Sequence, residues 1–305
     1  MTKRLKKSEF MMAYMIIITL ACTIGGFFFG AHYMKSKIET AQAQALEAQK
    51  QEAEKERLLQ EQKLYSEQDF IRFYYAVYSP LLDLKKAHFD VMDQWGQMDK
   101  KAQEQALKQL SRTADATLKS VEKSVSLSTA PLLLQAQTQF KDSVRAYLDS
   151  MDEVRTDQNS NALTPGDIAA RMAPFQKSWL QAQELVYQSF ATWESAYVVK
   201  KPLPQTLPEK VSIEQWKSYP FHYKTYVTAT ALSHDHQWRA FNPEDLTARL
   251  DSLFNSSDAQ ALGIHDLTAA VRLLFATDAI HPGDFKQLRS RIYAGLQTPE
   301  VPLFK

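Results

Sequence analysis

The chain has little of what usually marks catalysis or covalent cross-linking. Cys22 is its only cysteine, so no disulfide forms within the chain and folding must depend on burial of a hydrophobic core. No Gly-rich phosphate loop, nucleophile elbow, HExxH run or pair of cysteines occurs, and the common catalytic signatures are therefore missing. We expect a non-enzymatic protein that needs no cofactor.

An excess of either charge is also missing, since 36 basic residues balance 35 acidic ones. Nucleic-acid binding requires a concentrated basic surface, and the chain has only a short basic cluster in residues 1–9. We expect no nucleic-acid partner. The cluster is better explained by the positive-inside rule, because the residues that flank a membrane helix on its cytoplasmic side are usually rich in lysine and arginine.

Long apolar runs are absent except for one, at residues 10–32, which contains no Asp, Glu, Lys or Arg. At about 1.5 Å per residue its length matches the hydrocarbon core of a bilayer, so it predicts one transmembrane helix that has the lipid bilayer as its partner. Residues 1–9 then form a cytoplasmic tail. Because no later run is long enough to cross back, we expect a single-pass cell-membrane protein with an extracytoplasmic C-terminus.

Two other interpretations of this N-terminal region stay open. Cleavage as a signal peptide is one, with small-residue patterns ending at Ala43 and Ala45, although the apolar run is longer than signal peptides need. Lipidation at Cys22 is the other, because Thr19-Leu20-Ala21-Cys22 resembles a lipobox. Against it, the apolar run continues after Cys22.

Small residues recur every four positions in the apolar run, at Cys22, Gly26 and Gly30. On a helix they line one side and let a second backbone approach closely, which is the small-xxx-small arrangement of membrane helix pairs. These three residues are the candidate face for association of membrane helices. A homodimer through this face is one hypothesis, although glycine is common in membrane helices in any case.

The rest of the chain predicts an all-α protein. Residues 33–65 are rich in Ala, Gln, Glu and Lys without Gly or Pro, which favours a helical stalk. In residues 66–200, apolar residues recur at steps of three and four in four segments: Phe70 to Trp95, Leu107 to Val125, Leu133 to Val154, and Ile168 to Tyr197. Four such segments with short connections predict an antiparallel four-helix bundle.

Three prolines in residues 201–210 mark the expected boundary between domains. After this Pro-rich linker, residues 211–305 predict a smaller domain of short helices. Helix starts are indicated at Asn242-Pro243 and His281-Pro282, as at Thr164-Pro165 in the preceding domain, because each pair places a proline and then an acid in a first turn.

Aromatic residues in residues 66–200 are dense enough to line a pocket for a planar or lipidic molecule, although side chains at helical spacing more often fill a core. The set is Phe70, Phe73, Tyr74, Tyr75, Tyr78, Trp95, Trp179, Tyr187, Phe190, Trp193 and Tyr197. His88 falls between Leu84 and Val91 on an apolar face. We expect it to hydrogen-bond a neighbour, because no second histidine in these residues completes a metal site.

His234 and His236 are the candidate metal ligands, separated by Asp235. Two imidazoles at this spacing point the same way only in extended backbone, and a zinc site needs a third ligand such as His265 or His281. A solvated loop at the end of a helix, with histidine near the negative end of the helix dipole, is the better explanation of the pair.

The sequence supports three hypotheses. The first is a membrane-anchored extracytoplasmic scaffold, adaptor or accessory subunit that binds another envelope protein. The second is a ligand-sensing helical bundle that signals through a partner, and the third is a metal-dependent enzyme that uses the C-terminal histidines. An apolar surface groove would favour the first, a closed cavity the second, and converging histidines or acids the third.

Overall fold

The computed structural model describes residues 65–123, 127, 129–160, 163–202, 204, 207, 208 and 210–305, together with isolated positions between residues 11 and 50. Residues 58–305 belong to one compact unit and residues 1–57 to another. In the described part of the chain every regular element is helical, and two extended residues, Ser212 and Asp266, form an isolated bridge. The prediction of an all-α protein is therefore confirmed.

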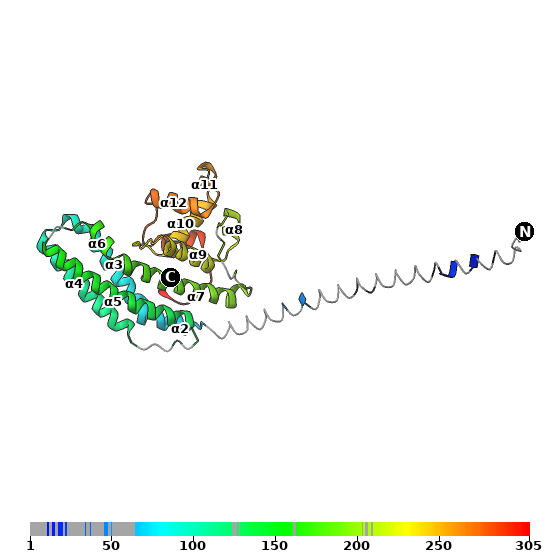
Figure 1. Cartoon of the computed structure of the whole chain (residues 1–305). Coiled ribbons are helices and arrows are strands. Elements are labelled where there is room, and N and C mark those ends of the chain that lie inside the picture. Colours follow the sequence, from blue (N-terminus) through cyan, green and yellow to red (C-terminus); the bar gives the residue numbers. More distant parts are fainter. Residues whose placement is uncertain are drawn as a thin grey trace, which may run out of the picture. The chain divides into compact units, whose positions relative to one another are not determined.

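The elements from residue 65 to residue 199 include the four longest helices of the described residues (Figure 1). They are α2 (Glu67–Phe73), η1 (Tyr74–Tyr78), α3 (Ser79–Gln94), η2 (Trp95–Gln97), α4 (Lys100–Val121), α5 (Pro131–Ser160), α6 (Pro165–Arg171), α7 (Ala173–Trp193) and η3 (Glu194–Val199). Of these, η1 and η3 are π-helical and η2 is a 3₁₀ turn.

The elements after residue 210 are shorter. They are α8 (Ile213–Ser218), α9 (Phe221–His234), α10 (Pro243–Asn255), α11 (Asp258–Ala261), α12 (Leu267–Ala276), α13 (Asp284–Ile292) and the 3₁₀ turn η4 (Pro302–Phe304). Capping boxes fix the starts of α6 and α10, at Thr164 and Asn242. Near His281-Pro282, α13 begins at Asp284 after Gly283, whose φ of 89° is accessible to glycine without strain.

Pro80 does not end the first long helical segment. Proline has no N–H, so the carbonyl of Ala76 loses its partner four residues later. The hydroxyl of Ser120 in α4 donates to that carbonyl at 2.9 Å, and Thr117 donates to the carbonyl of Pro80 at 3.2 Å. The π-helical turn η1 lies directly before the proline, and α4 supplies the missing hydrogen bond.

Pro174 does interrupt the segment that the sequence predicts as one helix from Ile168 to Tyr197. A proline cannot donate to the carbonyl four residues earlier and its ring crowds that carbonyl. The segment accordingly divides into α6 and α7, with Met172 between them.

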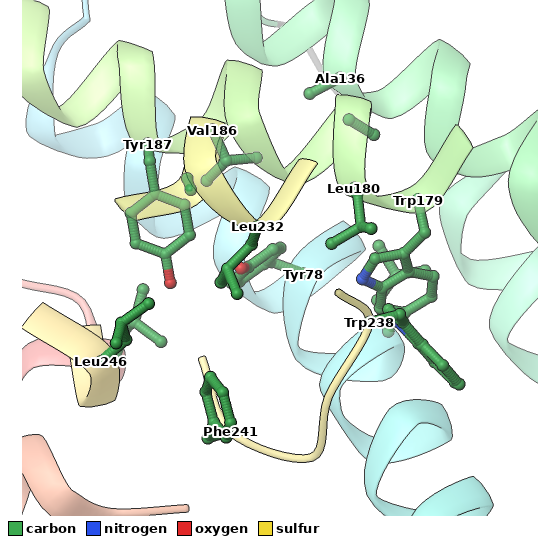
Figure 2. Packing of buried hydrophobic residues seen from close by; sticks show 14 of the residues in the cluster. Tyr78, Ala136, Trp179, Leu180, Val186, Tyr187, Leu232, Trp238, Phe241 and Leu246 are labelled. Atoms are coloured by element: carbon green, nitrogen blue, oxygen red, sulfur yellow. The ribbon is translucent and has the colours of Figure 1, made fainter. Parts of the chain in front are cut away.

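Helix α7 contacts α5 on one side and α9 on the other, and these are the most extensive contacts in the described residues. It is also rich in large buried side chains, including Phe175, Trp179 and Tyr187. Figure 2 shows Leu232 of α9, and Trp238, which follows α9, lying beside labelled side chains of α7. The parts before and after residues 201–210 therefore share one core.

Candidate functional site

A surface groove of about 630 Å³ lies where three distant parts of the chain meet. Its walls come from the start of α2, from the end of α7 with η3, and from α13 and the chain that follows it as far as residue 305. The lining residues include Glu67, Trp193, Tyr197, Val198, Arg289, Leu296, Gln297, Thr298, Glu300 and Lys305. We call this the η3 groove.

Aromatic side chains form much of the η3 groove. Trp193 and Tyr197 stack with ring centroids 6.1 Å apart and an interplanar angle of 27°. Trp193 is only 6% exposed, whereas Tyr197 is 39% exposed. Val198 and Leu296 add apolar surface. π-Helical turns such as η3 are frequent at functional sites, and this one places a partly exposed aromatic face in a hollow.

The wall opposite η3 is held by the end of the chain. Phe304 is fully buried, with its ring 4.9 Å from that of Phe190 and 4.7 Å from that of His222. Val301 and Leu303 are buried as well. Burial of three apolar side chains anchors this segment strongly, at roughly 1.5–3 kcal/mol each, so the groove has firm walls.

Glu194, the first residue of η3, links the groove to α9. It is buried, and its Oε2 accepts a hydrogen bond of 3.1 Å from the backbone N–H of Tyr223 at the start of that helix. Burial raises the pKa of Glu194 to about 7, although backbone N–H groups of the first turn of α9 oppose the shift. Pro220 at the N-cap position of α9 has no side chain that can accept a hydrogen bond. The carboxylate of Glu194 supplies the acceptor instead.

Replacing Glu194 with glutamine is expected to remove a pH dependence of stability. A carboxyl whose pKa is raised on folding stabilises the native state below its unfolded pKa of 4.5, and this contribution is lost as the pH rises through about 7. The free energy of unfolding of Glu194→Gln minus that of the wild type should therefore increase by about 3 kcal/mol between pH 4.5 and pH 8. Urea denaturation across this range measures it. Parallel curves for the two proteins would contradict the assignment.

Apart from the η3 groove, a cluster of polar side chains is buried between the helices before residues 201–210 and those after them. Lys85 of α3 donates to the carbonyl of Phe241 at 2.7 Å and to Oδ1 of Asn242 at 2.9 Å. Tyr187 of α7 donates a short hydrogen bond to Glu244 at the start of α10. Burial lowers the pKa of Lys85 to about 8 and, with the neighbouring Asp245, raises that of Glu244 to about 8.

Asp245 extends this cluster to α13. Its Oδ2 accepts from the N–H of Asn242 at 3.0 Å, and its Oδ1 accepts from the N–H groups of Gly283 and Phe285 at 3.1 Å each. A cavity of about 140 Å³ adjoins the cluster and is lined in part by Tyr74 and Glu244. This volume is well below the roughly 300–1,000 Å³ of drug-sized ligand pockets, so the cluster is better suited to joining helices than to binding a ligand.

Sequence reasoning missed both the η3 groove and the buried cluster. One signal was present for Lys85, because it shares a helical face with Leu81, Leu84 and His88 and so places a charge among apolar residues. Glu244 was interpreted only as an acid near the start of a helix. Most aromatics of the predicted pocket set fill the core instead, while Trp193 and Tyr197 line the groove.

The predicted histidine sites are dispersed. His88 is buried, with Nδ1 3.1 Å from the hydroxyl of Tyr147, and burial lowers its pKa to about 4. His234 lies exposed at the end of α9, 2.8 Å from Asp235, and His236 follows in an exposed turn. In the part of the chain that the structure describes, no three His, Cys, Asp or Glu side chains are grouped to hold a metal.

The candidate membrane face is described only at Cys22, which is helical and exposed. Gly26, Gly30 and most of the predicted transmembrane helix and stalk lie outside the described residues. Among the helices that are described, none is both long and apolar enough to span a membrane.

Comparisons with known proteins add no relative. No protein-family model matches the chain, and no curated protein or solved structure is similar to it. A proposal of function must therefore rest on the geometry of the described residues.

Proposed function

We propose that the chain is a non-enzymatic scaffold, adaptor or accessory subunit of a cell-envelope assembly, which binds another protein through the η3 groove. The observation that carries this proposal is the groove itself, where a stacked aromatic pair is partly exposed between firm walls. Buried aromatic anchors surrounded by polar residues are typical of the centres of protein interfaces.

The proposed architecture places this groove outside the cell membrane. Residues 10–32 anchor the chain as one transmembrane helix, and residues 33–65 form a stalk. The arrangement of charges around the apolar run supports an N-terminus in the cytoplasm. Contacts of α3 with α4, of α4 with α5 and of α5 with α7 support an antiparallel four-helix bundle in residues 66–200.

The two competing functions have less support. A sensor needs a pocket that encloses most of its ligand, whereas the η3 groove is open to the surface and the cavity beside Glu244 has a volume of only about 140 Å³. A metal-dependent enzyme needs converging ligands, whereas His234 and His236 are exposed at a helix end and pair with no third ligand in the described residues.

Crosslinking in native membranes tests the proposal. The tagged full-length protein and its Tyr197→Asp variant would be crosslinked in the host cell, purified and compared by mass spectrometry. We expect one specific protein to be recovered with the wild type and to decrease at least about 10-fold with Tyr197→Asp, because a charge on the groove surface opposes burial of an apolar partner. Tyr197 is 39% exposed and is not a member of the buried core, so the change removes no core side chain.

Tyr75→Asp is the matched control. Tyr75 lies in the other π-helical turn, is 63% exposed and does not line the groove. Recovery of the partner should be unchanged in this variant. The proposal fails if the chain is recovered alone, or if Tyr197→Asp and Tyr75→Asp recover the same partner equally.

A further inference from the structure

We infer that the η3 groove binds an extended segment of its partner, one that carries an acidic side chain next to a large apolar side chain. This inference rests on the proposed function and specifies the chemistry of the partner. Three features support it: unused backbone N–H groups in one wall, the aromatic surface, and the charge of Arg289.

The wall after α13 presents backbone N–H groups that are not used within the described chain. Residues 296–299 have no regular structure, and the N–H groups of Gln297, Thr298 and Glu300 donate no hydrogen bond within the described chain. An occupant that covers this wall removes water from these groups and must replace its hydrogen bonds. An extended peptide offers free backbone carbonyls, whereas a helix has already used its own.

The aromatic surface of the groove is suited to an apolar side chain of the partner. The parallel rings of Trp193 and Tyr197, with Val198 and Leu296, give an apolar hollow suited to one large side chain. In an extended segment alternate side chains point the same way, so one side chain fills this hollow while the next faces solvent. Burying a large aliphatic or aromatic side chain contributes roughly 1.5–3 kcal/mol.

The charged side chains around the groove differ in whether they already have a partner of opposite charge. Lys305 in the groove forms an ion pair with Glu300. Arg289 is half-buried in the last turn of α13 and has no carboxylate within ion-pair distance in the described residues. Glu67 on the opposite wall is exposed in the first turn of α2, where the helix dipole already favours its charge. Arg289 is thus the group that gains most from an acidic partner residue.

A peptide library provides a probe that does not depend on the identity of the partner. Random 12-residue peptides displayed on phage would be selected against the detergent-solubilised full-length protein, and the dissociation constants of the enriched peptides would be measured by fluorescence anisotropy. We expect the enriched peptides to share an acidic residue within two positions of a large apolar one. Arg289→Glu should weaken their binding at least about 10-fold, and Glu67→Lys should not weaken it.

Arg291→Glu is the matched control, because Arg291 is exposed on the same helix and does not line the groove. A charge-reversed peptide, with lysine in place of its acid, should bind Arg289→Glu more tightly than the wild type. The inference is overturned if no peptide is enriched, if enriched peptides are helical, or if Arg289→Glu and Arg291→Glu act equally. It is also overturned if the enriched peptides resemble residues 58–64 or 201–210, since the groove would then bind this chain's own segments.

These outcomes are separable from those of the proposed function. If crosslinking recovers a partner that depends on Tyr197 but the library yields no acidic extended peptide, the adaptor function stands and only the partner chemistry is wrong. If no partner is recovered at all, the adaptor function itself fails.

Discussion

Replacing Lys85 with methionine is expected to lower the free energy of unfolding by about 3–5 kcal/mol, because it leaves two buried oxygen acceptors without their charged donor. Methionine fills similar space but has no donor. The carbonyl of Phe241 and the side-chain oxygen of Asn242 then lose the donor that lies 2.7 Å and 2.9 Å from them. Guanidinium denaturation of the full-length protein at pH 7 measures the effect.

Lys86 provides the control for this substitution. It is the next residue along α3, its side chain is 74% exposed, and it pairs only with Asp90 in the same helix. Lys86→Met should change the free energy of unfolding by less than about 0.5 kcal/mol. A Lys85→Met protein within about 1 kcal/mol of the wild type would show that the cluster does not hold the two parts together.

The helices could be predicted because their causes are local. In α4 the apolar residues Leu107, Leu110, Ala114 and Val121 follow the helical period, and all are buried. The pairs Thr164-Pro165 and Asn242-Pro243 give the starts of α6 and α10 because cap chemistry involves only a few neighbouring residues. Such short-range signals allow a helix to be predicted even when the elements that pack against it are unknown.

The π-helical turns could not be predicted from the same period. At η1 the sequence shows only that Pro80 lacks an N–H, which is compatible with a kink, a new helix or the observed turn. Ser120 decides the outcome by donating to the carbonyl of Ala76, and it lies 44 residues away. A contact at that separation leaves no trace in local periodicity.

The candidate site was missed for the same reason. The η3 groove combines α2, η3 and the end of the chain, and the buried cluster joins Lys85 to residues 156 and 157 positions later. The composition of residues 201–210 indicates a break in helical structure but does not show whether the parts on either side pack together. Packing of α9 on α7 depends on matching apolar faces, which a single sequence does not reveal.

Trp238 is the residue with which we expect to test this shared core most directly. It follows α9 and packs among four rings of the first part of the chain, with centroids 4.9 Å from His88, 4.7 Å from Phe89, 4.9 Å from Phe175 and 5.9 Å from Trp179. Figure 2 shows it beside Trp179 of α7. Truncation leaves a large void among these rings, so Trp238→Ala should lower the free energy of unfolding by about 3–5 kcal/mol.

The shape of the unfolding transition matters as much as its midpoint. If the helices before and after residues 201–210 unfold as one unit, Trp238→Ala shifts a single transition, and hydrogen exchange shows protection falling together in α5, α7 and α9. Leu262→Ala is the control, because that side chain is 59% exposed and its loss should change the free energy by less than about 0.5 kcal/mol. Two separate transitions, with only the later helices destabilised by Trp238→Ala, would instead mean that the Pro-rich segment joins two independently folding domains and that the contact between α7 and α9 adds little stability.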